Sequence, residues 1–269
     1  MEIKNGLVII GCGKMGSALL EGWLKSGVLP QDIWIIEPKP TARLLALEGQ
    51  GLHLNTGFPP QPALCLLAVK PQYMQQALPQ LRELNGGLTV YLSIAAGISL
   101  AALEDSLGEA AIIRAMPNTP AAIGLGITAL IGNARTSSAQ MDLARSLLQS
   151  IGETVLLQNE AQMDAVTGLS GSGPAYVFYM IEALTEAGIE QGLPEALAGQ
   201  LALATVAGAG QLAVRSSESV AQLRINVTSP EGTTEAGLRV LMDADTGLKP
   251  LLGKTVAAAV IRARALGEH

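Results

Sequence analysis

The sequence predicts an α/β fold in which a doubly wound, mainly parallel sheet is followed by an all-α domain. Three observations support this prediction. A short apolar strand, Leu7–Ile10, runs into three closely spaced glycines; apolar runs then alternate with helical segments as far as residue 158; and beyond that residue the apolar pattern is helical. We therefore expect two domains, residues 1–158 and residues 159–269.

The glycines Gly11, Gly13 and Gly16 follow the first strand and open a helix expected at residues 15–26. In such a turn the first glycine permits the sharp bend, the second lets the backbone approach a pyrophosphate, and the third lets the helix pack closely on the strand. The N-terminus of the helix favours an anion, because its N–H groups are unpaired and its dipole is positive there. The pattern is typical of a Rossmann-like, dinucleotide-binding domain.

A second strand is expected at Ile33–Ile36, and Glu37 follows it directly. A carboxylate at this place in a Rossmann-like domain accepts hydrogen bonds from both hydroxyl groups of a cofactor ribose. Its charge repels a 2′-phosphate, although Lys39 lies close enough in sequence to offset that repulsion. We expect NAD(P)H as cofactor, with Glu37 favouring NADH; the alternative is a solvated carboxylate at a strand end.

The remaining segments complete the first domain. Residues 41–48 and 137–150 predict helices, and the prolines of residues 55–62 predict a loop, because proline cannot continue a helix. Further strands are expected at residues 52–54, 64–69, 88–94, 112–115, 127–131 and 154–157. Ligands lie beyond the carboxyl ends of parallel strands, which places the following strand-end residues against the cofactor: Ala68, Val69, Lys70, Pro71, Ala95 and Gly97. Lys70 is equally well explained as a solvated residue at a helix start.

The second domain contains two unusually apolar helices. Residues 174–191 carry one narrow polar stripe of glutamates, and residues 197–214 carry no charge. We expect the uncharged helix to be buried among other helices rather than to cross a membrane, because it contains glutamine, threonine and glycine. One subunit is too small to bury both helices, so we expect an obligate homodimer with mutually wrapped helical domains.

Composition excludes several functions. A net charge of −6 without a basic patch argues against nucleic-acid binding. Cys12 and Cys65 lie in the turn and in an expected strand, which favours a reducing, cytoplasmic compartment over a disulfide framework. The N-terminus resembles no signal peptide. The glutamate stripe lacks histidine partners for a metal, and Ser170 and Ser172 lack the five-residue pattern and the base of a serine hydrolase.

Residues 227–238, VTSPEGTTEAGL, form the second informative stretch. A hydroxyl, a proline at an expected first helical position and a glycine precede two threonines, which is the chemistry of a helix N-terminus that holds an anion. An ordinary capped helix explains the same residues equally well.

Five motifs, in order along the chain, resemble those of the pyrroline-5-carboxylate reductase family. They are IGCGKMG at 10–16, AVKP at 68–71, RAMPNTPA at 114–121, SGSGPAY at 170–176 and TSPEGTTEAG at 228–237. The resemblance implies a Rossmann domain and a helical domain interlocked with that of a second subunit, in dimers that often assemble into larger rings such as decamers. It also implies hydride transfer from NAD(P)H to the C=N bond of 1-pyrroline-5-carboxylate, giving L-proline in the last step of proline biosynthesis.

The resemblance also implies roles for individual residues. Cofactor contacts fall on Ile10, Gly11, Cys12, Gly13, Lys14, Met15, Asn55 and the AVKP segment. The substrate carboxylate falls on Ser229, Gly232 and Thr233, with the hydroxyl of Thr234 near the ring nitrogen as the catalytic group. Two departures stand out: Glu231 occupies the place of a common glycine, and Glu37-Pro38-Lys39 replaces a common Asn-Arg-Ser/Thr turn, which bears on the use of NADPH.

The residue inventory agrees with reduction of an imine. A hydroxy-acid dehydrogenase needs a titratable group to move a proton, and the helical half offers only Lys249, Lys254 and His269, all outside the glycine-rich motifs. An imine nitrogen can arrive already protonated, so positioning and a neutral donor suffice. The alternatives are another NAD(P)-dependent imine or β-hydroxyacid oxidoreductase, which should carry a lysine within residues 170–176, and a non-catalytic dinucleotide-sensing dimer, for which TSPEGTT is unnecessary.

Overall fold

The computed structural model describes residue 3, residues 5–84 and residues 87–267, and the chain divides into two compact units. The first unit comprises Met1–Ser172 together with Ala259–His269, and the helical unit comprises Gly173–Ala258. This division differs from the single boundary expected after residue 158. Residues 159–172 lie with the first unit because they are bonded to it: Glu160 pairs with Arg114, and the Asn118 side chain donates to the Ser170 hydroxyl.

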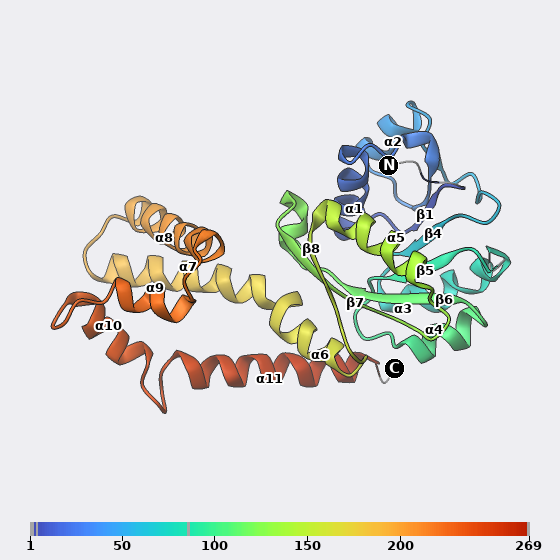
Figure 1. Cartoon of the computed structure of the whole chain (residues 1–269). Coiled ribbons are helices and arrows are strands. Elements are labelled where there is room, and N and C mark those ends of the chain that lie inside the picture. The colour runs from blue at the N-terminus through green and yellow to red at the C-terminus, as the bar shows by residue number, and fades with distance from the viewer. Residues whose placement is uncertain (1–2, 4, 85–86, 268–269) are drawn as a thin grey trace. The chain divides into compact units, whose positions relative to one another are not determined.

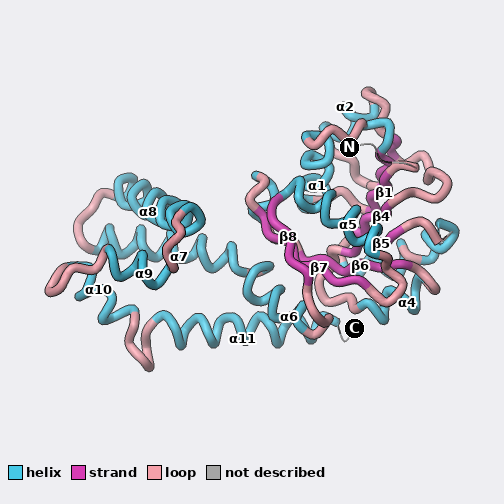
Figure 2. Tube along the Cα trace, in the orientation of Figure 1, coloured by secondary structure: helices cyan, strands magenta, loops and turns pink. Residues whose placement is uncertain are grey.

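An eight-stranded sheet forms the centre of the first unit (Figures 1 and 2). Its spatial order is β3-β2-β1-β4-β5-β6-β7-β8. All neighbouring pairs are parallel except β6 and β7, which confirms the predicted doubly wound, mainly parallel sheet. The strands are β1 (Leu7–Ile10), β2 (Ile33–Ile36), β3 (His53–Leu54), β4 (Leu64–Leu67), β5 (Val90–Ser93), β6 (Ala111–Met116), β7 (Gly126–Gly132) and β8 (Gly152–Leu156).

Helices cover both faces of this sheet. The helices of the first unit are α1 (Lys14–Lys25), α2 (Ala42–Glu48), α3 (Pro71–Ala77), α4 (Leu100–Leu107), α5 (Ser138–Leu148) and α6 (Gln162–Val166). Apolar residues of α1, α2 and α5 share one buried cluster, and those of α3 and α4 share another. Helices α3 and α4 are absent from the sequence prediction, although Pro71 at the start of α3 and Ser99, which caps α4, are ordinary helix-start residues.

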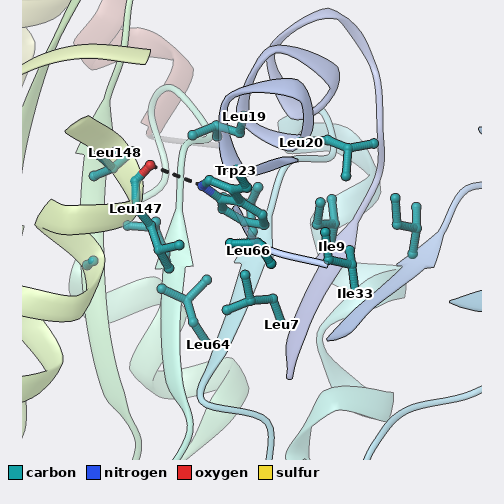
Figure 3. Packing of buried hydrophobic residues seen from close by; sticks show 14 of the residues in the cluster. Leu7, Ile9, Leu19, Leu20, Trp23, Ile33, Leu64, Leu66, Leu147 and Leu148 are labelled. Atoms are coloured by element: carbon teal, nitrogen blue, oxygen red, sulfur yellow. Dashed lines mark hydrogen bonds between the residues drawn. The ribbon is translucent and has the colours of Figure 1, made fainter. Parts of the chain in front are cut away.

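The core follows from the alternation of side chains along each strand. In β1, Leu7 and Ile9 point into one cluster whereas Val8 and Ile10 point into the other, so all four side chains are buried. Trp23 of α1 is fully buried, and its indole N–H donates to the carbonyl of Leu147 at 3.1 Å (Figure 3). That bond satisfies the polar group of a large core residue and ties α1 to α5.

The helical unit contains α7 (Gly173–Glu190), α8 (Glu195–Arg215), α9 (Val220–Asn226) and α10 (Thr233–Leu241), and α11 (Leu248–Gly267) runs from it into the first unit. Within a single chain most of residues 197–214 are exposed, so the expected burial of this helix is left to the second subunit of the expected dimer. In α8 the buried residues are Ala198 and Ala202, and in α7 there are none, because the described part of a single chain supplies no further helical layer over them. Among the described residues, α8 is also the one helix whose length and composition would suit a membrane span.

Candidate active site

A cavity of about 580 Å³ lies beyond the carboxyl ends of β1, β2 and β4. Its lining includes these residues predicted as cofactor contacts: Ile10, Gly11, Gly13, Glu37, Ala68, Val69 and Lys70. It also includes Ile36, Pro38, Tyr73 and Ala77, which the sequence did not single out, and Lys39. Tyr73 and Ala77 belong to α3, so missing that helix is the reason they were missed.

The glycine turn has the geometry of a cradle. Gly11 adopts a left-handed φ of 83°, and a Cβ built on it would lie 2.7 Å from Cγ1 of Val69. A Cβ on Gly16 would lie 2.7 Å from the carbonyl oxygen of Gly11, so α1 packs directly on the turn. Around Gly13 nothing lies within 4 Å of such a Cβ, and no side chain caps the first turn of α1. The backbone is therefore open to an anion at this place.

Glu37 is held against the glycine turn. One carboxylate oxygen accepts the backbone N–H of Cys12 at 2.8 Å, and the other accepts the backbone N–H of Lys39 at 3.0 Å. A carboxylate oxygen can accept more than one hydrogen bond, so a ribose hydroxyl can still bind there. The solvated-carboxylate alternative does not describe this half-buried, bonded group.

Asn55 positions Glu37 instead of lining the cavity. It adopts a left-handed φ of 55°, and its side chain bonds both backbone polar groups of Glu37: Oδ1 accepts the N–H at 3.0 Å and Nδ2 donates to the carbonyl at 3.1 Å. The loop at residues 55–62 is thereby joined to the end of β2.

The other predicted cofactor residues are not part of the cavity lining. Cys12 is buried, its Sγ lies 3.6 Å from Oγ of Ser17, and burial raises the pKa of its thiol. Lys14 and Met15 begin α1, and Pro71 begins α3. Ala95 is buried after β5, and Gly97 packs against the end of α11, where its space is limited by Leu266 and Gly267.

An ion pair between buried Arg114 and half-buried Glu160 lies beside Gly97, and no local sequence pattern signals it. Arg114, 6% exposed, donates to Oε1 of Glu160 at 2.6 Å, and the same oxygen accepts the backbone N–H of Leu100 at 2.8 Å. The pair lines a cavity of about 350 Å³ together with the end of α11. Because each charge is paired within the first unit, we assign the pair to holding β6, α4 and residue 160 together.

The SGSGPAY segment spans the end of a π-helical turn and the start of α7. Residues Thr167–Gly171 form that turn, which joins α6 to α7, and α7 begins at Gly173. The side chain of Asn118 bridges this turn and β7, since it donates to the Ser170 hydroxyl at 3.3 Å and accepts the backbone N–H of Ile127 at 3.0 Å.

The predicted substrate residues lie in the helical unit, at the start of α10. The helix begins at Thr233 with Gly232 as its N-cap, so Pro230 is not at the first helical position. The reason is Glu231, whose left-handed φ of 61° interrupts the helix between them. No side chain caps α10, and Ser229, Thr233 and Thr234 are exposed. The oxygen of Ser229 lies over Gly232, where a Cβ would collide with it.

Comparison with known proteins adds independent information on both parts of the chain. Residues 160–266 match the family model for pyrroline-5-carboxylate reductase dimerisation, and residues 6–97 match the model for NADP oxidoreductase, coenzyme F420-dependent. The pyrroline-5-carboxylate reductase of Synechocystis sp. is 39% identical over 274 residues, with all of both chains covered. That of Pseudomonas aeruginosa is 37% identical, over 98% of this chain and 97% of the relative.

Solved structures agree with these relatives. The structure of a pyrroline-5-carboxylate reductase from Coxiella burnetii aligns with a TM-score of 0.90 at 33% identity, and it covers 97% of this chain and 98% of that one. The pyrroline carboxylate reductase of Plasmodium falciparum, solved with NADP bound, aligns with a TM-score of 0.85 at 28% identity, over 99% of this chain and 100% of that one.

Proposed function

Because this chain belongs to the pyrroline-5-carboxylate reductase family, we propose that it transfers a hydride from NAD(P)H to the C=N bond of 1-pyrroline-5-carboxylate and forms L-proline, the last step of proline biosynthesis. The observation that carries the proposal is full-length similarity together with a glycine turn beside a cavity that Glu37 lines. We further propose that the enzyme is cytoplasmic, which its free and buried cysteines, Cys12 and Cys65, support.

The first unit fits a dinucleotide. Gly13 presents open backbone to the pyrophosphate after the sharp turn at Gly11, and the uncapped start of α1 at Lys14 and Met15 favours its charge. When bound, the reduced nicotinamide supplies the hydride. Ile10 and residues 68–70 line the cavity where the cofactor would lie. Cys12 and Pro71, from the resemblance to the family, and Ala95 and Gly97, from their place after β5, are proposed as further cofactor contacts.

Glu37 and Asn55 act together at the ribose. The carboxylate accepts ribose hydroxyl groups, and Asn55 holds its backbone in place. We propose NADH as the preferred cofactor, since a 2′-phosphate would meet the charge of Glu37. Lys39 lines the same cavity and is the group that would let NADPH bind as well.

The start of α10 holds the substrate. Ser229 and the backbone at Gly232 and Thr233 bind its carboxylate, since the uncapped N–H groups of a helix start favour an anion. The hydroxyl of Thr234 orients the ring nitrogen. Because that nitrogen arrives protonated, the chain needs no acid of its own, and its contribution is positioning, electrostatic stabilisation and exclusion of water.

The helical segment 159–269 serves as the dimerisation and substrate domain. The dimerisation family model and the exposed apolar surfaces of α7 and α8 support a homo-oligomer built from dimers. Whether dimers assemble further, for example into a decameric ring, is decided by the measured mass of the particle.

One assay tests the proposed activity. Purified protein should oxidise NADH or NADPH when 1-pyrroline-5-carboxylate is added, and L-proline should accumulate in equal amount. Oxidation of neither cofactor would overturn the proposal and favour a dinucleotide-sensing dimer. Activity with β-hydroxyacids but not with the imine would favour the other reductase alternative.

A further inference from the structure

The loop before α10 contains a non-glycine residue in the left-handed region. Glu231 has a φ of 61°, and it immediately precedes Gly232, the N-cap of the helix. A residue with a Cβ disfavours this region by about five- to thirtyfold in population relative to its usual conformations, whereas glycine does not. Something in the surrounding structure must therefore hold Glu231 in place.

A hydrogen bond to a side chain of α10 holds Glu231 in this conformation. The backbone N–H of Glu231 donates to the carboxylate of Glu235 at 2.6 Å. Glu235 is the third residue of α10, the position from which an acidic side chain reaches back over a helix N-terminus. Here it reaches one residue further than the N-cap, to the left-handed residue itself. Glu235 is half-buried, whereas Glu231 is exposed.

We propose that Glu235 is a positioning residue for the substrate loop and that its bond to Glu231 replaces the conformational freedom of a glycine. Ser229 lies two residues before Glu231, Gly232 directly follows it and Thr234 lies in the first turn of α10, so the loop keeps its shape only while Glu231 stays left-handed. The inference rests on the proposed function, which assigns the substrate carboxylate to this loop.

The charge of Glu235 has the opposite effect on the substrate. The carboxylate of Glu235 lies in the first turn of α10, where it repels a substrate carboxylate bound at the same helix start. It also competes with the substrate for the favourable interaction with the helix dipole. Loss of the hydrogen bond therefore weakens substrate binding, whereas loss of charge alone strengthens it or leaves it unchanged. Glu235→Gln separates the two effects because it keeps an acceptor oxygen and removes the charge.

The test is a set of variants at the two positions. Glu235→Ala should raise the KM for 1-pyrroline-5-carboxylate about five- to tenfold. This is the lower part of the roughly five- to thirtyfold factor by which a non-glycine residue disfavours the left-handed region. The KM for the cofactor should not change. Glu231→Gly combined with Glu235→Ala should restore the substrate KM to within about twofold of wild type, because glycine needs no such support. Glu235→Gln should stay within about twofold of wild type. Glu48→Ala, at the exposed end of α2, makes the same change of charge outside the site and should have no effect.

A second measurement needs no substrate. Glu231→Gly should raise the thermal midpoint more in the Glu235→Ala background than in wild type, and hydrogen exchange of residues 231–234 should be faster in Glu235→Ala alone. Failure of the glycine to rescue, or equal stabilisation in both backgrounds, would overturn the role of Glu235. An equal rise of KM in Glu235→Gln and Glu235→Ala would overturn it as well. Absence of reductase activity in wild type would overturn the proposed function alone, since the stability comparison would still stand.

Discussion

The two units bury their apolar side chains to very different degrees. In the first unit β1 is fully buried, and Trp23 and Tyr91 have no exposed surface. In the helical unit the only buried apolar side chains are those of Ala198 and Ala202, whereas Phe178 and Leu203 are more than half exposed. The first unit completes its core within one chain, and the helical unit does not.

The same contrast applies to the site. The cavity proposed for the cofactor is lined by residues of the first unit alone, whereas the proposed substrate residues of the helical unit lie exposed at a helix start. Exposed apolar surface on this scale marks a protein–protein interface. We infer that folding of the helical unit and completion of the substrate site both depend on a second subunit, while cofactor binding does not.

The largest effect should follow from a charge placed on the apolar surface of α8. Leu203→Asp would bury an unpaired carboxylate in the expected dimer interface, which weakens association on the order of a hundredfold or more. Since folding of an obligate dimer is linked to association, helix content should then fall on dilution. Sedimentation and circular dichroism over a range of concentrations measure both.

Leu45→Asp is the matched control in the first unit. Leu45 is exposed on α2 to a similar degree as Leu203, but on a unit with a closed core, so this variant should remain assembled. A stable, monodisperse wild-type monomer at micromolar concentration would contradict the comparison between the units.

The next effect concerns the proposed role of Thr234 in catalysis. Thr234→Ala should lower kcat/KM about 10- to 100-fold, the effect of one positioning hydrogen bond, while cofactor affinity in the first unit stays constant. Stability should change little, because Gly232 is the N-cap and no side chain caps α10. A stability loss of about 1 kcal/mol with intact kinetics would instead show that the threonine caps its helix.

The pH profile of the same variant tests the origin of the proton. If the substrate carries it, wild type and Thr234→Ala should lose activity along the same high-pH limb. A limb that disappears in the variant would assign the threonine to a proton relay of the enzyme. The proton would then come from the enzyme and not from the substrate.

A smaller effect is expected for the cofactor. Glu37→Ser should shift the preference from NADH towards NADPH by about tenfold, since a charge-assisted hydrogen bond to ribose is lost and a repulsion is removed. Because Glu37 also holds the N–H of Cys12, both cofactors should bind more weakly than in wild type. Dissociation constants for both cofactors, with Glu48→Ser as control, measure the shift. An unchanged ratio would show that Glu37 acts only on the glycine turn.

Sequence patterns predicted the sheet well because its signals are local. Continuous apolar runs located every strand, and the observed order and mainly parallel pairing confirm the predicted doubly wound fold. Helix α4 was missed because its apolar residues, Leu100, Leu103 and Leu107, are few and its cap at Ser99 is a single residue. The burial of α8 stays a prediction, because periodicity shows that a surface is apolar but not which chain covers it.

The site divides in the same way. The positions of Gly11, Gly13 and Glu37 in the cavity lining follow from their spacing, because strand, turn and helix are contiguous in the sequence. The bonds of Asn55 to Glu37 and of Glu160 to Arg114 join residues far apart in sequence, and no local pattern signals them. The left-handed conformation of Glu231 was also not predictable from residue type, since glycine is the residue that favours it.

The smallest expected effect is on stability at low pH, and it compares an acidic residue of the helical unit, Asp243, with one of the first unit, Glu21. Asp243 accepts hydrogen bonds from the backbone N–H and the hydroxyl of Thr246 and from the backbone N–H of Asp245, and these bonds lower the pKa of its carboxyl below the usual 3.8. A lowered pKa in the folded state stabilises the protein above the pKa of the unfolded state, and this contribution is lost as the pH falls through the folded value. In the first unit Glu21 follows the same rule, because its hydrogen bond with Arg43 lowers its pKa.

Asp243→Asn keeps the acceptor oxygen and removes the charge, so the denaturation midpoint of the variant should fall less than that of wild type when the pH is lowered from about 5 to about 3. Above that range the variant should be slightly less stable than wild type, because an ionised acceptor makes the stronger hydrogen bond. Glu21→Gln, in the first unit, should likewise reduce the loss of stability as the pH falls. If unfolding is linked to dissociation, the denaturation midpoint of the helical unit should also rise with protein concentration. The contribution of Asp243 should add to that rise without changing how steeply the midpoint depends on concentration. Parallel acid limbs for wild type and Asp243→Asn would show that the turn before α11 is held by its backbone and not by this carboxylate.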